Sequence, residues 1–172
     1  MVASIIVLVT SFLISNFSET RLNLDQTMNL IVADIRDVQN KALTSSTYSG
    51  ALRCGYGISY LTLRSFQMYT SPIASSVCSG YNRNYEAGVD LTVRTITIGD
   101  QEVEFFGRFP DVFFEPPNPT TFIDNVSTLD APPSSIIISK AGTNCYTDRG
   151  NCRIICVYPS GRIDTSTGST CP

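Results

Sequence analysis

The sequence predicts an α+β protein in which one long N-terminal helix packs on a mostly antiparallel β-sheet domain with disulfides. Three observations support this fold class. Residues 1–17 form an almost charge-free apolar run, and the chain then continues as far as Gly50 without a Pro or Gly. Short segments of alternating polarity, together with six Cys, make up the remainder. A continuous helix followed by short strands is the simplest structure with these patterns.

The first half of the predicted helix, residues 1–20, is expected to lie in a membrane. Its apolar side chains are Ile5, Ile6, Val7, Leu8, Val9, Phe12, Leu13, Ile14 and Phe17. A spanning helix needs about 20 apolar residues, and this run is slightly shorter and contains several Ser and Thr. A secretory signal peptide is the alternative, but no Lys or Arg precedes the run, and the helical pattern does not stop where a signal would be cut.

The second half, residues 21–47, is predicted to be amphipathic and to pack on the sheet. Its apolar residues recur every three or four positions: Leu24, Met28, Ile31, Ile35, Val38 and Ala42. We expect one helix from near residue 2 to about residue 46, roughly 65–70 Å long at 1.5 Å per residue. The alternative is two helices hinged near residues 16–18, but no Gly or Pro there favours a break.

The first strands of the β-rich domain, residues 48–172, are expected within 55–63 and 64–71, which read as a pair. Residues 71–88 read as a loop. Residues 89–100 alternate cleanly, and 101–107 is expected to return beside them after a turn at Gly99–Asp100.

The later strands are less regular. Residues 111–125 begin as a strand but contain three Pro, so we expect them at an edge or in a loop. Residues 134–142 and 152–164 are expected to form two strands joined by a turn at TDRGN. Three consecutive Ile at 136–138 indicate burial on both faces. In total, six or seven strands are predicted.

Six Cys in a chain with an apolar N-terminus indicate an oxidising compartment and disulfides at Cys54, Cys78, Cys145, Cys152, Cys156 and Cys171. Fifteen pairings are possible when all six are bridged. Proximity in the sequence favours Cys54–Cys78, Cys145–Cys152 and Cys156–Cys171. No C-x-x-C pair occurs, which disfavours structural zinc.

Composition restricts the possible functions. The net charge of −3 argues against broad nucleic-acid binding, which requires a basic surface. The chain has no His, so it cannot contain a Ser-His-Asp or Cys-His catalytic arrangement. We therefore expect no enzymatic activity, no cofactor and no metal.

Four short motifs occur in order along the chain. They are Gln39-Asn40-Lys41-Ala42 near the helix end, Gly55-Tyr56-Gly57-Ile58, the segment VFFEPPNPTTFI, and Gly161-Arg162-Ile163. With the helix, they resemble type IV pilins and the pseudopilins of type II secretion, and most of all the H-type minor pseudopilins and FimT-like proteins (GspH/FimT-like). The resemblance covers nearly the whole chain, although each motif alone is weak.

The N-terminus departs from the pattern of these families. They begin with a basic leader that ends in Gly, followed by Phe and by Glu at the fifth mature position. This chain has Ile5 at position 5. The simplest interpretation is that Met1 lies inside the true helix and that about a dozen residues precede it, which would also lengthen the short membrane segment. The alternative is a degenerate pilin that cannot be processed.

The resemblance implies a structural subunit of a type IV pilus or type II secretion pseudopilus. Its partners would be other pilin or pseudopilin subunits, contacted through the N-terminal helix. The subunit would wait in the inner membrane with an extracytoplasmic domain, and its apolar half would then move into the core of a filament at the cell surface or across the periplasm. A membrane-anchored binding module, such as an adhesin or a DNA-uptake minor pilin, is the alternative.

Other polar residues give weaker signals of a functional site. Asp90, Asp100, Glu102 and Glu104 read as the solvated face of a strand pair rather than as a calcium or acid–base site. Asp124 and Asp130 flank a loop that could bind Ca²⁺, but no D-x-D-x-D-G loop is present. Arg149, Arg153 and Arg162 could form a small basic patch for DNA. Tyr81 and Tyr85 are expected to be buried loop anchors rather than an adhesive surface.

Overall fold

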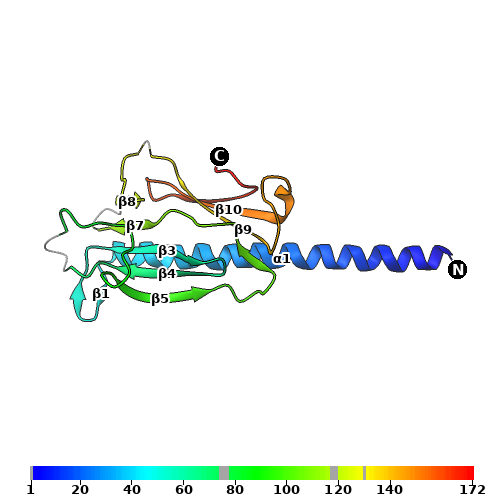
Figure 1. Ribbon diagram of the computed structural model, residues 1–172, viewed down its shortest axis with the longest axis horizontal. Coiled ribbons are helices and arrows are strands. Elements are labelled where there is room, and N and C mark those ends of the chain that lie inside the picture. Colours follow the sequence, from blue (N-terminus) through cyan, green and yellow to red (C-terminus); the bar gives the residue numbers. More distant parts are fainter. Residues whose placement is uncertain (1, 74–77, 117–119, 130) are drawn as a thin grey trace.

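The computed structural model describes residues 2–73, 78–116, 120–129 and 131–172, with side chains from Asn23 onward. Helix α1 (Val2–Leu43) is a single unbroken rod, as predicted. The β-domain packs against the C-terminal half of α1, and the N-terminal half of the helix extends beyond the domain (Figure 1). After Leu43 the chain leaves the helix through Ser45, whose φ of 47° is left-handed, a common helix ending.

Two antiparallel sheets and a short ribbon make up the domain. The five-stranded sheet has the order β5-β4-β3-β7-β8, and the four-stranded sheet has the order β11-β10-β9-β6. The strands are β1 (Thr47–Tyr48), β2 (Ala51–Leu52), β3 (Tyr56–Thr62), β4 (Ser65–Thr70), β5 (Leu91–Thr97), β6 (Val103–Phe105), β7 (Val112–Glu115), β8 (Thr120–Ile123), β9 (Ser134–Lys140), β10 (Cys152–Val157) and β11 (Ile163–Thr167).

The described residues thus contain more strands than the six or seven expected. One reason is that the segment 152–164 is not one strand. A tight turn divides it, in which Gly161 N donates to Tyr158 O at 2.8 Å and Tyr158 N donates to Arg162 O at 2.9 Å. Gly161 has a φ of 81°, which a residue with a side chain rarely adopts. The predicted pairing around the TDRGN turn is correct, since β9 and β10 are antiparallel partners.

The expected return of residues 101–107 beside 89–100 is wrong. Strand β6 belongs to the other sheet and pairs with β9, with Val103 opposite Lys140. Both Val103 and Phe105 are 1% exposed. The ring of Phe105 contacts Phe66 and Phe109 edge-on. Pairing of β6 with β9 places Val103 and Phe105 in the core between the sheets. A simple hairpin with β5 does not bury these side chains in that core.

The expected edge position of residues 111–125 is half correct. Strand β8 is the edge, but β7 lies inside the sheet between β3 and β8. Its residues Val112, Phe113 and Phe114 are fully buried. The prolines follow β7 rather than interrupt it, so they do not remove its ladder hydrogen bonds; Pro117 and Pro119 lie outside the described residues.

Strand β5 has a β-bulge that changes its alternation. Arg94 is paired with Met68 and Thr92 with Tyr69, which leaves Val93 without an opposite residue. Both Val93 and Ile96 then pack against the main core, although strict alternation places them on opposite faces. Strand β9 keeps its alternation, although its three consecutive Ile suggested burial on both faces. Ile136 and Ile138 are fully buried, whereas Ile137 is only half-buried.

The main core lies between α1 and the two sheets, since the helix contacts β3 and β7 of one sheet and β9 and β10 of the other. A second, smaller apolar cluster of Tyr69, Tyr81 and Phe113 covers part of the five-stranded sheet. This cluster explains Gly57, because a Cβ there would lie 2.6 Å from the Tyr69 ring and 2.7 Å from Val112 O. Glycine at this position permits close packing of the ring on the strand.

Candidate assembly surface

Helix α1 has a packed half and an extended half. In the packed half, Leu24, Ile35 and Ala42 are fully buried, Ile31 and Val38 are nearly so, and Met28 is half-buried. The amphipathic prediction for this half is therefore correct. The predicted membrane or filament-core residues, Ile5, Ile6, Val7, Leu8, Val9, Phe12, Leu13, Ile14 and Phe17, have helical backbones, but their side chains lie outside the described part of the structure.

Within the described part of the chain, no helix combines the length and hydropathy required to cross a bilayer.

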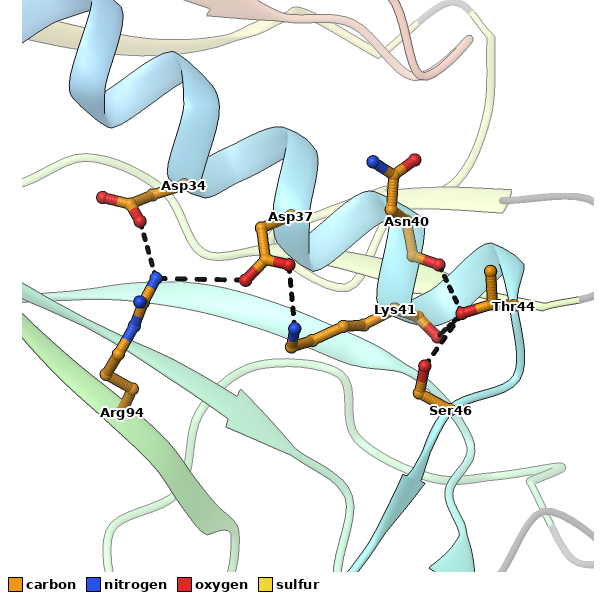
Figure 2. A network of polar contacts seen from close by, with 7 residues as sticks. All are labelled: Asp34, Asp37, Asn40, Lys41, Thr44, Ser46 and Arg94. Atoms are coloured by element: carbon orange, nitrogen blue, oxygen red, sulfur yellow. Dashed lines mark hydrogen bonds and ion pairs between the residues drawn. The ribbon is translucent and has the colours of Figure 1, made fainter.

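A polar network joins one side of the packed half to strand β5. Figure 2 shows Arg94 of β5 between two helix carboxylates, with its Nη2 at 2.6 Å from Asp34 Oδ1 and 3.9 Å from Asp37 Oδ2. Lys41 binds Asp37 from the next helical turn at 2.8 Å. Partial burial raises the pKa of Asp34, and the nearby Arg94 guanidinium opposes that shift. The network holds the helix beside the edge strand.

At the helix end, the same network continues through hydroxyl groups. Thr44 Oγ1 donates to Asn40 O at 2.8 Å and lies 2.8 Å from Ser46 Oγ (Figure 2). Asn40 O also accepts from Thr44 N. These contacts satisfy carbonyls that the end of a helix leaves without intrahelical partners.

A second ion pair joins the helix to the four-stranded sheet. Arg153 Nε donates to Asp25 Oδ1 at 2.5 Å, and Arg153 Nη1 donates to the carbonyls of Gly150 and Cys152. The Arg153 side chain is only 8% exposed. The basic patch considered for Arg149, Arg153 and Arg162 is therefore not assembled: Arg153 is buried, and Arg162 stacks on Tyr158 and pairs with Asp164.

A side-chain hydrogen bond joins the first and the last of the four sequence motifs. The Gln39 side-chain amide donates to Gly161 O at 2.9 Å. Gly161 has little room for a side chain, since a Cβ would lie 3.0 Å from Gln39 Nε2 and 3.4 Å from Thr121 Oγ1. The residues that carried the resemblance thus fix the helix against the turn before β11.

A groove of about 330 Å³ lies between the helix and the end of β5. Apolar residues from both sides line it, including Leu30, Phe66 and Ile96. Leu30 is 68% exposed on the packed half of the helix. Sequence reasoning missed this position, because its helical period assigns Leu30 to neither the core stripe nor the charged face.

The three disulfides join Cys54 to Cys78, Cys145 to Cys152 and Cys156 to Cys171. This is the pairing that proximity in the sequence favoured. The first bridge ties the loop after β4 to the start of β3, and the last ties the C-terminus to β10. All six sulfurs are bridged.

The loop tyrosines are structural. Tyr81 is buried, and its hydroxyl donates to Asp90 Oδ1 at 2.5 Å. Tyr85 packs edge-on against Tyr69. Burial raises the pKa of Tyr81, and its bond to Asp90 adds to that shift. Burial also raises the pKa of Tyr69 well above its ordinary value.

The acidic residues do not form a metal site in the described part of the chain, where no group of three or more His, Cys, Asp or Glu lies in position to bind an ion. Asp90 is buried in the tyrosine contact rather than on a solvated face. Glu102 pairs with Lys140, and Glu104 accepts from Gly142 N. Asp124 Oδ1 accepts from Asp111 N, whereas Asp130 lies outside the described residues.

Comparison with solved structures finds the crystal structure of the type IV minor pilin FimU from Pseudomonas aeruginosa strain PAO1. The two share a TM-score of 0.53 and 13% sequence identity over 88% of this chain and 94% of that chain. The fold is that of a type IV pilin. No protein-family model and no curated protein sequence matches the chain. The pilin-like fold and the three disulfides agree with an extracytoplasmic location.

Proposed function

We propose that this chain is a structural, non-catalytic subunit of a type IV pilus or a type II secretion pseudopilus, of the GspH/FimT-like group. It would assemble with other pilin subunits through the apolar half of its helix, residues 1–20. Residues 21–47 would be the packed half, and residues 48–172 the extracytoplasmic domain. Before assembly, residues 1–20 would be held in the inner membrane, and the assembled filament would cross the periplasm or reach the cell surface.

The observation that supports this proposal most strongly is the one-sided packing of α1. The domain covers the helix from Leu24 onward, and Figure 1 shows the remaining half extending away from both sheets. A long apolar helix with no domain around it needs another apolar environment, either lipid or other helices. Burial of apolar surface is worth roughly 25 cal/mol per Å² removed from water.

The domain itself is suited to a rigid outer surface. Ion pairs at Asp25 and Asp34 and the Gln39 amide fix the packed half at three points along its length. The three disulfides close the loops around this framework. A subunit whose helix and domain move as one body transmits the helix packing to the surface of a filament.

The test introduces one carboxylate into each half of the helix. In cells that make the protein, Ile6→Asp should abolish its recovery in filaments sheared from the surface, because a carboxylate in a helix core is costly to bury. The matched control is Asn40→Asp, at an exposed position of the packed half, which should be recovered like the parent. Equal recovery of both variants contradicts assembly through the helix. Mass spectrometry of the native N-terminus in the same fractions shows whether a processed residue precedes Met1.

A further inference from the structure

The end of the domain nearest the extended half of α1 carries exposed apolar side chains. Leu61 and Leu63, at the tip between β3 and β4, are 47% and 50% exposed, and Tyr146 is 72% exposed. The half-buried Phe106 lies edge-on to Tyr146, with ring centroids 5.3 Å apart. We refer to Leu61, Leu63, Phe106 and Tyr146 as the apolar shelf.

Backbone and side-chain contacts place the shelf beside the start of the packed half. Ile98 and Asp100 line the same groove as Asn23 and Gln26 of the helix. Ile98 N donates to Arg64 O at 2.8 Å, which holds the β3–β4 tip next to that groove. On the other sheet, Arg153 reaches Asp25. Figure 1 shows the loop between β9 and β10 and the β3–β4 tip at the end from which the helix extends.

Local backbone geometry exposes the leucines. The pairing of β3 with β4 shifts between Tyr60 and Thr62, so Leu61 sits at a bulge. Tyr60 packs against the core, whereas Leu61 faces outward. Phe105 N donates to Leu63 O at 2.7 Å, which fixes Leu63 next to the aromatic pair. Leu63, Phe106 and Tyr146 line one surface hollow. Exposed apolar side chains that gather in one place mark an interaction surface.

Charges around the shelf are balanced within the domain. Lys140 lies 3.7 Å from Glu102, and Arg64 Nη2 donates to the Asp100 carbonyl at 2.5 Å. Glu104 Oε1 accepts from Gly142 N at 2.9 Å. No single sign of charge dominates these contacts, so attraction here depends on apolar and aromatic groups rather than on a charged partner.

We propose that the apolar shelf lies in the headgroup region of a lipid bilayer while the extended half of α1 is inserted in that bilayer. This inference rests on the proposed function. Six positions separate Phe17, the last residue of the apolar run, from Asn23, which is about 9 Å at 1.5 Å per residue. The shelf therefore lies close to the level at which the helix would leave the lipid. Tyrosine with neighbouring aliphatic side chains suits the interface between lipid and water.

The chain has no Trp, so a single Trp can report its surroundings. Three variants of the full chain are reconstituted in phosphatidylcholine vesicles, with and without bromine on the acyl chains near the headgroup. Tyr146→Trp probes the shelf. Leu52→Trp is the matched control, since Leu52 is 45% exposed in β2, beyond the other end of the helix. Phe12→Trp tests whether the apolar half of the helix is inserted.

The expected result is loss of emission in brominated vesicles for Tyr146→Trp and Phe12→Trp, but not for Leu52→Trp. Added salt should leave the loss at Tyr146→Trp unchanged. Combining Leu61→Ser and Leu63→Ser with Tyr146→Trp should reduce the quenching of that Trp by brominated lipid. Quenching of Phe12→Trp alone overturns the shelf proposal and leaves the proposed function standing, whereas the absence of quenching at both positions overturns membrane insertion as well. The emission maximum of Tyr146→Trp could instead shift to the blue only at high protein-to-lipid ratio and lose this shift on dilution in lipid. That result would assign the shelf to contact between copies of the chain and would also overturn the proposal.

Discussion

Gln39 on the helix and Gly161 in the last turn, 122 positions apart, are joined by a hydrogen bond of 2.9 Å between the side-chain amide and the carbonyl. The contact is partly buried and lies at the C-terminal end of the packed half. It connects the first element of the chain to the strand that closes the four-stranded sheet.

Breaking this contact should destabilise the domain. Gln39→Ala should lower the free energy of unfolding by about 1 kcal/mol, the usual net value of one hydrogen bond. Gly161→Ala should cost roughly 1–3 kcal/mol, because it forces a side chain onto a φ of 81°. Urea unfolding followed by circular dichroism measures both.

The double variant tests whether the two residues act together. Because a Cβ at residue 161 would lie 3.0 Å from Gln39 Nε2, removing the amide should relieve part of the crowding, so the combined loss should be less than the sum. Asn40→Ala is the control at an exposed neighbouring position. Strict additivity contradicts a direct contact.

The Arg153–Asp25 pair should be asymmetric. Arg153→Ala should cost about 2–3 kcal/mol, because a buried side chain with carboxylate and carbonyl partners is lost. Asp25→Ala should cost only about 1 kcal/mol, since Asp25 is 49% exposed and the guanidinium keeps its carbonyl partners.

Arg162→Ala, at an arginine that is 61% exposed, serves as the control for Arg153→Ala and should change stability by less than about 1 kcal/mol. The same urea titration applies to all three variants. If Asp25→Ala proves the more damaging of the pair, the assignment of Arg153 as the buried partner is wrong.

Asp111 should make stability dependent on pH. Burial raises the pKa of its carboxyl above the ordinary value of 3.8, and bonds from Ser59 and from Tyr85 N oppose that shift. A folded-state pKa above the unfolded value gives stability that is full below pH 3.8 and is lost as pH rises through the raised pKa. Asp111→Asn cannot ionise, so its melting temperature relative to the parent should increase with pH across that window.

The exposed Asp148→Asn gives the baseline for losing a carboxyl elsewhere on the domain. Melting curves for the parent and both variants, recorded in small pH steps, provide the comparison. A difference between Asp111→Asn and the parent that stays constant, or that falls with increasing pH, argues against a raised pKa.

The disulfides should differ in importance with the loops they close. The sequence separations are 24, 15 and 7 residues for Cys54–Cys78, Cys156–Cys171 and Cys145–Cys152. In the loop-entropy model, paired Ser substitutions should cost from about 3.5 kcal/mol for the longest loop to about 2.5 kcal/mol for the shortest. Unfolding of the three double variants ranks them. A reversed order would show that native packing around the bridges, rather than loop length, determines their effect.

The sequence was sufficient to predict the helix and its buried face. Its period of 3.6 is read from local residues, and Leu24, Ile35 and Ala42 lie where that period places them. The same holds for the β3–β4 pair, which is joined by only two residues, and for the β9–β10 pair, whose strands are neighbours in the sequence. Proximity was also enough to suggest the disulfides, because the chain between paired cysteines is short.

The interactions between distant segments could not be predicted in this way. Nothing local assigns β6 to the sheet of β9 rather than to the sheet of β5. The contact of Gln39 with Gly161 and the burial of Arg153 against Asp25 depend on how both sheets fit around the helix. A bulge such as that at Val93 also reverses the inward and outward alternation of a strand, and the residue types in the strand do not reveal it.

The attachments of the helix at Asp25 and Gln39 have a consequence for the order of events during biogenesis. Their partners, Arg153 and Gly161, lie 128 and 122 positions later in the chain and therefore leave the ribosome after the helix. Until these residues have been synthesised, the helix therefore lacks both contacts. Native docking of the helix must wait until strands β10 and β11 are present, a delay typical of folds with contacts far apart in sequence. A protein truncated before Arg153 should leave the helix undocked, and hence open to quality-control proteases.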